Sequence, residues 1–149
     1  MARILVVDDE PHIREFLCTV LMQAGHTVRM APDGQAGLEQ AAAEPPDLVL
    51  VDMVMPHLDG IALTERLRAM PATAAVPLLM LTACEGAMDH ALSVGVDDFL
   101  MKPVDIATLT LRVAALLAAR TAMAVGDDLQ RALTYVRTLE AHRVTARRA

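Results

Sequence analysis

The chain has 149 residues, of which 54% are hydrophobic, and a formal net charge of -6. This length fits one domain with a full core and a small extension. An acidic chain with 2% aromatic residues and no Trp lacks the stacking surfaces of single-strand nucleic-acid binders. The first residues show no basic region of a signal peptide, and no uninterrupted apolar run approaches the roughly 18 residues of a membrane span. We therefore expect a cytoplasmic protein without direct nucleic-acid or membrane partners.

Short apolar runs typical of buried strands alternate along the chain with helical patterns. The expected strands are Ala2–Val7, Thr27–Ala31, Leu48–Val51, Val76–Leu81 and Phe99–Met101. The expected helices run from Pro11 to Gly25, over Asp33–Ala43, Gly60–Met70 and Gly86–Val94, and from Asp105 to about Arg120. Because crossovers between parallel strands are right-handed, this alternation predicts an α/β fold: a doubly wound five-stranded parallel sheet with five helices. The order 2-1-3-4-5 of the flavodoxin-like group fits it.

The end of the chain has a different character. We expect residues 1–120 to form the main domain and residues 121–149 to form a helical tail or linker. Leu129, Leu133, Val136 and either Leu139 or Glu140 recur at helical spacing, which predicts an amphipathic helix. An isolated helix of this length is marginal in water, so its apolar stripe needs a covering surface. That surface is either the main domain or a second copy of the chain, and we favour a homodimer.

Charged residues stand where several of the predicted strands end. Asp8 and Asp9 follow the first strand, Asp52 follows the third, and Lys102 follows the fifth. In an open α/β sheet, ligands bind at the carboxyl ends of the strands, so these groups are expected to share one site. Closely packed carboxylates repel one another and need a cation. Oxygen ligands favour Mg²⁺, and a carboxylate beside Mg²⁺ and a lysine can accept a phosphoryl group.

Four segments in order give the chain, from Arg3 to about Arg120, a resemblance to a known family. It resembles the receiver domain of bacterial two-component response regulators, of which the chemotaxis receiver is one. The matching segments are Ile4–Glu10, Asp47–Pro56 with the following Asp59-Gly60, Leu81–Ala83, and Gly95–Pro103. Each segment alone is a weak signal, but four in the right order and spacing are specific.

The resemblance implies a role for each charged residue. Asp52 is the expected phosphoacceptor, and Asp8 and Asp9 the expected metal-binding pair, with Asp9 touching Mg²⁺ directly and Asp8 through water. Asp52 and the backbone carbonyl of Val54 complete the expected ligands. Taken alone, the acidic pair before Pro11 favours helix capping instead. Lys102, the only lysine in the chain, is expected to pair with the phosphoryl oxygens.

Further family features fall on the last two segments. Lys102-Pro103 matches a cis peptide bond, and Thr82 with Phe99 matches the pair that changes position on phosphorylation. In that scheme the threonine hydroxyl turns to the phosphoryl group and the aromatic ring follows it, which alters the surface of the fourth helix, fifth strand and fifth helix. From the residues alone, an ordinary strand threonine and a core aromatic are equally good interpretations. Val54 and Cys84 offer no strong group to orient water, which predicts a long-lived phosphoryl state.

The expected function is therefore that of a signalling receiver, which is not an enzyme toward other substrates. It accepts a phosphoryl group on Asp52 from a histidine kinase or a histidine phosphotransfer protein and acts on a downstream effector protein or output domain. The alternative is the receiver fragment of a longer transcription factor or output enzyme, with the tail as a signalling helix. A purely protein-binding pseudo-receiver is disfavoured because the acidic pair, acceptor, threonine and lysine are all present.

Overall fold

A computed structural model describes the backbone of residues 1–83 and 85–148. Side chains are described for these residues except 85, 124, 125, 127, 128, 131, 135 and 138–148. The chain divides into two compact units, Met1–Leu117 and Ala118–Ala149. Cys84 and the tail positions Leu139 and Glu140, which the sequence singled out, lie outside the described side chains.

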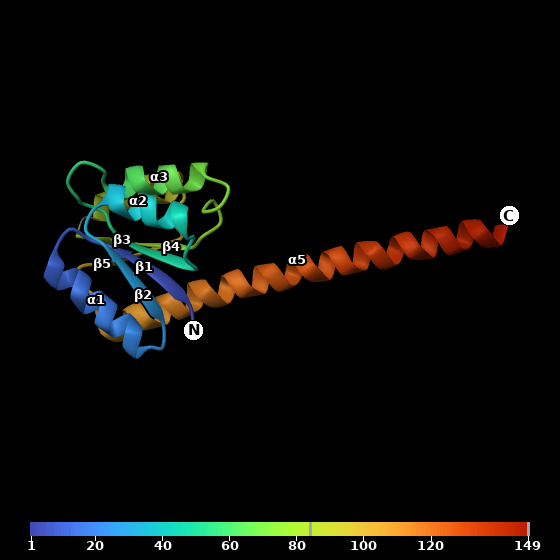
Figure 1. Ribbon diagram of the computed structural model, residues 1–149, viewed down its shortest axis with the longest axis horizontal. Helices are drawn as coiled ribbons and strands as arrows, with labels where there is room; N and C mark the ends of the chain where they lie inside the picture. The colour runs from blue at the N-terminus through green and yellow to red at the C-terminus, as the bar shows by residue number, and fades with distance from the viewer. Residues whose placement is uncertain (84, 149) are drawn as a thin grey trace. The chain divides into compact units, whose positions relative to one another are not determined.

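The first unit is built on five parallel strands in the order β2-β1-β3-β4-β5 (Figure 1). Their bounds are β1 Arg3–Val7, β2 Thr27–Ala31, β3 Leu48–Asp52, β4 Leu78–Thr82 and β5 Asp98–Met101. The predicted doubly wound, flavodoxin-like sheet is confirmed. In register, Val7 pairs with Val51 and Thr82 with Met101, so the carboxyl ends of the central strands lie together.

Three of the helices, the second, third and fifth, begin at aspartates that cap them. The helices are α1 Pro11–Gln23, α2 Gly34–Ala43, α3 Gly60–Ala69, α4 Met88–Val94 and α5 Ile106–Arg148, with a short 3-10 helix η1 Glu85–Ala87. The carboxylates of Asp33, Asp59 and Asp105 accept the backbone N–H three residues later. Such side-chain caps satisfy amides that have no partner inside the helix.

Hydrophobic side chains fill both faces of the sheet. Leu63, Leu67 and Ala91, from α3 and α4, are buried in one cluster. Leu17 and Leu21 from α1 are buried with the start of α5 in the other. Figure 1 shows the same division, with α2 and α3 on one side of the strands and α1 with the first turns of α5 on the other. The strands are therefore covered on both faces, as a parallel sheet requires.

Some predicted boundaries were wrong. The fourth strand begins at Leu78 and not at Val76. Val76 directs its carbonyl oxygen to Arg68, and Pro77 has no N–H for a strand partner. The segment before α4 is the 3-10 helix η1, and α5 extends to Arg148 where the sequence suggested an end near Arg120.

The segment Ile106–Met123 of α5 is long and apolar enough to span a membrane by length and composition alone, with a mean hydropathy of 1.4. Packing accounts for part of this character. Leu109 and Val113 are buried against the sheet, and Arg112 between them forms an ion pair with Asp98 at 2.9 Å. Leu109 and Val113 therefore belong to the hydrophobic core of the first unit.

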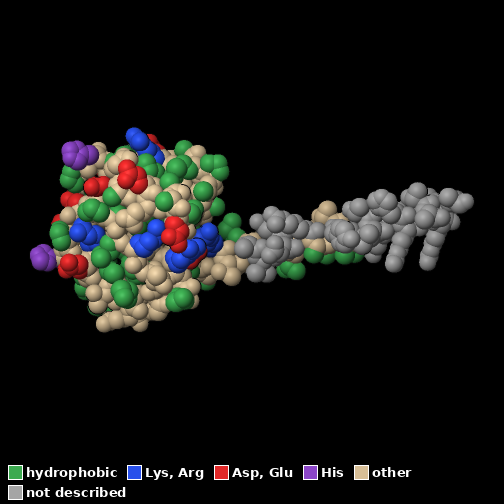
Figure 2. Space-filling model, viewed as in Figure 1, with side chains coloured by type: hydrophobic (Ala, Val, Ile, Leu, Met, Phe, Trp, Pro, Cys, Tyr) green, Lys and Arg blue, Asp and Glu red, His purple; other side chains and the backbone are tan. Residues whose placement is uncertain are grey.

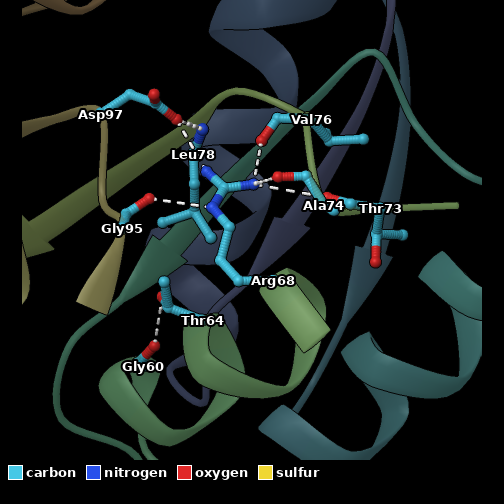
Figure 3. Close-up of polar contacts among 9 residues, drawn as sticks. All are labelled: Gly60, Thr64, Arg68, Thr73, Ala74, Val76, Leu78, Gly95 and Asp97. Atoms are coloured by element: carbon cyan, nitrogen blue, oxygen red, sulfur yellow. Dashed lines mark hydrogen bonds and ion pairs between the residues drawn. The ribbon is translucent and has the colours of Figure 1, made fainter. Parts of the chain in front are cut away.

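Arg68 connects several chain segments at the amino-terminal edge of the sheet (Figure 3). The Arg68 guanidinium donates to Gly95 O at 2.9 Å and Val76 O at 2.7 Å, and pairs with the Asp97 carboxylate at 2.8 Å. It also donates to the carbonyls of Thr73 and Ala74. The same Asp97 oxygen accepts the backbone N–H of Leu78. This arginine cluster, centred on Arg68 and Asp97, ties α3 to the segments that enter β4 and β5.

Candidate functional site

The opposite edge, at the carboxyl ends of the strands, holds the predicted acidic residues. Asp52 is the last residue of β3, and Asp8 directly follows β1. Asp8 remains in the sheet because its N–H donates to Ala31 O at 3.2 Å. Asp8 is 0% exposed and Asp52 is 5% exposed. Burial of two neighbouring acids is costly, which marks this edge as a functional site.

Asp8, Asp9 and Asp52 come together as the sequence predicted. One carboxylate oxygen from each lies within 4.8 Å of the others. Asp8 Oδ1 accepts the N–H of Glu10 at 2.9 Å, but Asp8 Oδ2 is buried without a hydrogen-bond partner among the described residues. A buried carboxylate oxygen without a donor is the chemical environment that a cation would satisfy. The three residues therefore fit a divalent metal ion with oxygen ligands.

Lys102 supplies the positive charge at this edge. Its Nζ lies 3.1 Å from Asp52 Oδ1, and its side chain is 22% exposed. The backbone directs it there, because Lys102 N donates to Thr82 O at the end of β4. The peptide bond to Pro103 is cis. One ammonium against three carboxylates leaves the site short of positive charge, which matches a divalent cation.

The environment shifts the pKa of both buried acids upward. For Asp8, burial raises the pKa, and the nearby Asp52 charge raises it further, against the hydrogen bond from Glu10. For Asp52, burial also raises the pKa, while the hydrogen bond and charge of Lys102 and the backbone N–H of Val54 lower it. The charged forms are therefore disfavoured until a cation or an equivalent donor arrives.

Two residues support the site in ways that sequence reasoning missed. A Cβ at Gly60 would lie 2.5 Å from the Asp52 carbonyl oxygen, so only glycine lets α3 begin against the end of β3. Gly60 N donates to Met53 O at 2.9 Å in the same contact. The Arg14 guanidinium donates to the Asp8 carbonyl at 2.7 Å. Gly60 stood inside a recognised motif, whereas nothing in the sequence pattern indicated Arg14.

Thr82 and Phe99 lie on the adjacent strands β4 and β5. Thr82 ends β4 and is 3% exposed, and its hydroxyl donates to the thioether sulfur of Met53 at 3.5 Å. Phe99 on β5 is half-buried and packs on the same core cluster as Met53. Val54 is 69% exposed. Cys84 lies outside the described residues, and its predicted effect stays a prediction.

Comparison with known proteins agrees with this geometry. The response regulator receiver domain family matches residues 4–114. The DNA-binding dual master transcriptional regulator RpaA of Synechocystis sp. is 40% identical over 119 residues, which cover 78% of this chain and 49% of RpaA. Protein PilH of Pseudomonas aeruginosa is 40% identical over 120 residues, which cover 79% of this chain and 99% of PilH. The chain thus spans about half the length of RpaA.

A solved structure shows the same fold. The receiver domain of the sensor histidine kinase PA1611 from Pseudomonas aeruginosa PAO1, which holds a magnesium ion in its active-site cleft, is 29% identical. The alignment has a TM-score of 0.74 and covers 78% of this chain and 98% of that one. The order of the strands, the acidic edge and the family match over residues 4–114 lead to one conclusion. The chain belongs to the receiver domain family of two-component response regulators.

Proposed function

We propose that Asp52 is the phosphoacceptor of this receiver, and that a histidine kinase or histidine phosphotransfer protein is the donor. An Asp52 carboxylate oxygen forms a bond to phosphorus while the phosphorus–nitrogen bond of the phosphohistidine breaks. The electron pair of that bond returns to the imidazole, which takes up a proton. The observation that carries the proposal is the buried Asp52 beside Lys102 Nζ at 3.1 Å, next to an Asp8 oxygen without a donor.

The other residues act on charge and position. Asp8, Asp9, Asp52 and the backbone carbonyl of Val54 would hold Mg²⁺, which when bound offsets negative charge on the carboxylates and the phosphoryl oxygens. Mg²⁺ is supported by the carboxylate ligand set and by the magnesium ion of the PA1611 receiver. Lys102, now paired with Asp52, would turn to a phosphoryl oxygen. Thr82 would donate its hydroxyl to another, and Phe99 would follow Thr82.

The main partners we propose are proteins. The donor phosphohistidine must reach the acidic edge, and the change at Thr82 and Phe99 would be read on the surface of α4, β5 and α5 by a downstream effector protein. Figure 2 shows acidic and basic side chains mixed on the visible face of Met1–Leu117, without an extended basic patch among the described residues there. This mixture of charges on the visible face fits a protein partner better than a nucleic acid there.

A second candidate is that the chain is the receiver portion of a longer transcription factor or output enzyme. The alignment with RpaA, which covers 49% of that protein, favours it.

We propose residues 1–120 as the receiver and 121–149 as a tail that dimerises. In the tail, Leu129, Leu133 and Val136 are 60%, 51% and 49% exposed at helical spacing. Sedimentation of the full chain beside one ending at Arg120 tests this, and equal monomer masses would contradict dimerisation.

Phosphorylation of Asp52 is tested by intact mass. With acetyl phosphate and Mg²⁺ the wild-type chain should gain one phosphoryl group, and Asp52→Asn should gain none. A matched control is Asp33→Asn, which removes a carboxylate at the start of α2 but keeps a side chain that can cap the helix. Labelling that persists in Asp52→Asn, or is lost equally in Asp33→Asn, would contradict the assignment. Addition of EDTA should prevent labelling of the wild type.

A further inference from the structure

Of the three acidic residues of the site, Asp9 is the least supported by the sheet. Asp52 is the last residue of β3, and the N–H of Asp8 donates to Ala31 O of β2 at 3.2 Å. Asp9 instead lies in the short segment between β1 and α1. Its carboxylate is repelled by the other two, since one oxygen of each acid lies within 4.8 Å of the others. The place of Asp9 at the site therefore depends on contacts of the peptide groups beside it.

Hydrogen bonds hold the peptide groups on both sides of Asp9. The carbonyl of the peptide that links Asp8 to Asp9 accepts from the Arg14 guanidinium at 2.7 Å. The N–H of the peptide that links Asp9 to Glu10 donates to Asp8 Oδ1 at 2.9 Å. Because each peptide group is planar, holding one plane on either side restricts the backbone of Asp9 and the direction of its side chain. Arg14 supplies the contact on the amino-terminal side.

The first turn of α1 brings the Arg14 side chain back to the end of β1. Pro11 begins the helix, and the N–H of Arg14 donates to Glu10 O at 3.0 Å. Side chains of a helix lean toward its amino terminus, so the guanidinium reaches the Asp8 carbonyl from this position. A hydrogen bond from a charged guanidinium is stronger than one from a neutral donor. Arg14 therefore connects α1 with the proposed metal ligands without being a ligand itself.

We propose that Arg14 is a positioning residue for Asp9: its guanidinium fixes the peptide between Asp8 and Asp9 and so holds the Asp9 carboxylate at the cation site. This inference rests on the proposed Mg²⁺ site. The sign of its effect separates position from charge. If the positive charge of Arg14 acted alone, its removal would strengthen the binding of a cation. If Arg14 holds Asp9 in place, its removal weakens binding, because Mg²⁺ must then gather a carboxylate that its neighbours repel.

The probe is Mg²⁺ alone, added to the full chain. The midpoint of thermal unfolding is followed as MgCl₂ replaces NaCl at constant ionic strength, and its concentration dependence gives the dissociation constant. Arg14→Met keeps the aliphatic stem and removes every donor of the guanidinium. We expect it to raise the dissociation constant about 10-fold, as is typical of residues that orient a metal ligand. Each variant is compared with itself in EDTA, so a loss of stability without metal does not enter the result.

Arg29→Met is the matched control. The Arg29 guanidinium also donates to backbone carbonyls, those of Gln40 and Glu44 at the carboxyl end of α2. The control loses the same charge and the same kind of contact, and its dissociation constant should match that of wild type. A dissociation constant of Arg14→Met at or below the wild-type value would overturn the role of Arg14, and so would an equal rise in Arg29→Met. Such a result leaves the phosphoacceptor intact as long as the wild type is labelled at Asp52. A wild-type midpoint that does not respond to MgCl₂ overturns the proposed metal site and this inference together.

Discussion

The charged and polar groups at the two edges of the sheet differ in how fully they are partnered within the fold. At the amino-terminal edge, the Arg68 guanidinium meets four backbone carbonyls and the Asp97 carboxylate (Figure 3). At the carboxyl edge, three carboxylates face one ammonium, and Asp8 Oδ2 has no donor among the described residues. In the arginine cluster, the guanidinium and the Asp97 carboxylate have their partners within the fold. The carboxyl edge has fewer positive than negative charges and, among the described residues, one buried oxygen without a hydrogen-bond donor.

This contrast separates a structural ion cluster from a functional one. A protein gains stability when each buried polar group finds a partner within the fold, as around Arg68. A binding site keeps some groups without partners, so that the ligand completes them, and the folded protein is less stable for it. Removal of a charge should therefore destabilise the arginine cluster and stabilise the acidic one.

The largest expected effect is at Arg68. Arg68→Met keeps most of the aliphatic stem but removes every donor of the guanidinium, and we expect the free energy of unfolding to fall by about 3 kcal/mol. Chemical denaturation measures it. Arg112→Met is the matched control, because the Arg112 side chain is 48% exposed against 20% for Arg68 and its loss should cost less than about 1 kcal/mol. Similar losses in both variants would show that the arginine cluster has no special structural role.

A smaller effect of opposite sign is expected at Asp8. In the presence of EDTA, Asp8→Asn should raise the free energy of unfolding by about 1 to 2 kcal/mol, because it removes a buried charge that lacks a full set of donors. Denaturation of wild type and variant in the same buffer tests this. A variant that is less stable than wild type without metal would show that the acidic site is satisfied internally.

Asp8 should also make the stability of the protein depend on pH, in a direction that follows from its raised pKa. Burial raises the pKa of Asp8 in the folded protein, so the folded state binds more protons than the unfolded state between that raised value and the ordinary carboxyl pKa of about 4. Without metal, stability should therefore increase as the pH falls through this window, and it should be lowest at neutral pH. In Asp8→Asn the slope should be smaller, since Asp52 then keeps its raised pKa but Asp8 no longer contributes.

The last expected effect, within the range given for Asp8→Asn, is that of the metal ion. At ten times its dissociation constant, Mg²⁺ should add about 1.4 kcal/mol to the stability of the wild-type chain by linkage. Asp9→Asn should weaken this gain, and it can be followed as the shift of the thermal midpoint with MgCl₂ concentration. NaCl at equal ionic strength is the control for screening. An equal shift with both salts would show that the carboxylates do not bind the ion as a group.

The sequence predicted the parts of the fold that depend on local patterns. The alternation of strands and helices led to the correct sheet, and the positions of Asp8, Asp9 and Asp52 at strand ends predicted their grouping. Topology explains this success, because residues that end parallel strands must meet at one edge. The family resemblance also anticipated the cis peptide bond between Lys102 and Pro103.

Features that depend on long-range contacts could not be predicted in this way. Arg68 belongs to an amphipathic helix like other surface residues, and only the folded chain brings it to Gly95 and Asp97. The contact between Thr82 and Met53 likewise depends on strand register and side-chain conformation. The predicted helix end near Arg120 was also wrong, because α5 continues to Arg148, through Gly126, although glycine is a poor helix former.

The single lysine of the chain also has a consequence for its chemical modification. Reagents that acylate lysine side chains have one target in this sequence, Lys102. Acylation of Lys102 would remove the only positive charge paired with Asp52 among the described side chains, while every arginine elsewhere would stay charged. One small covalent group could thus neutralise the cation of the acidic site and leave the surface unchanged. The same reaction gives a specific handle for labels that report on this edge of the protein.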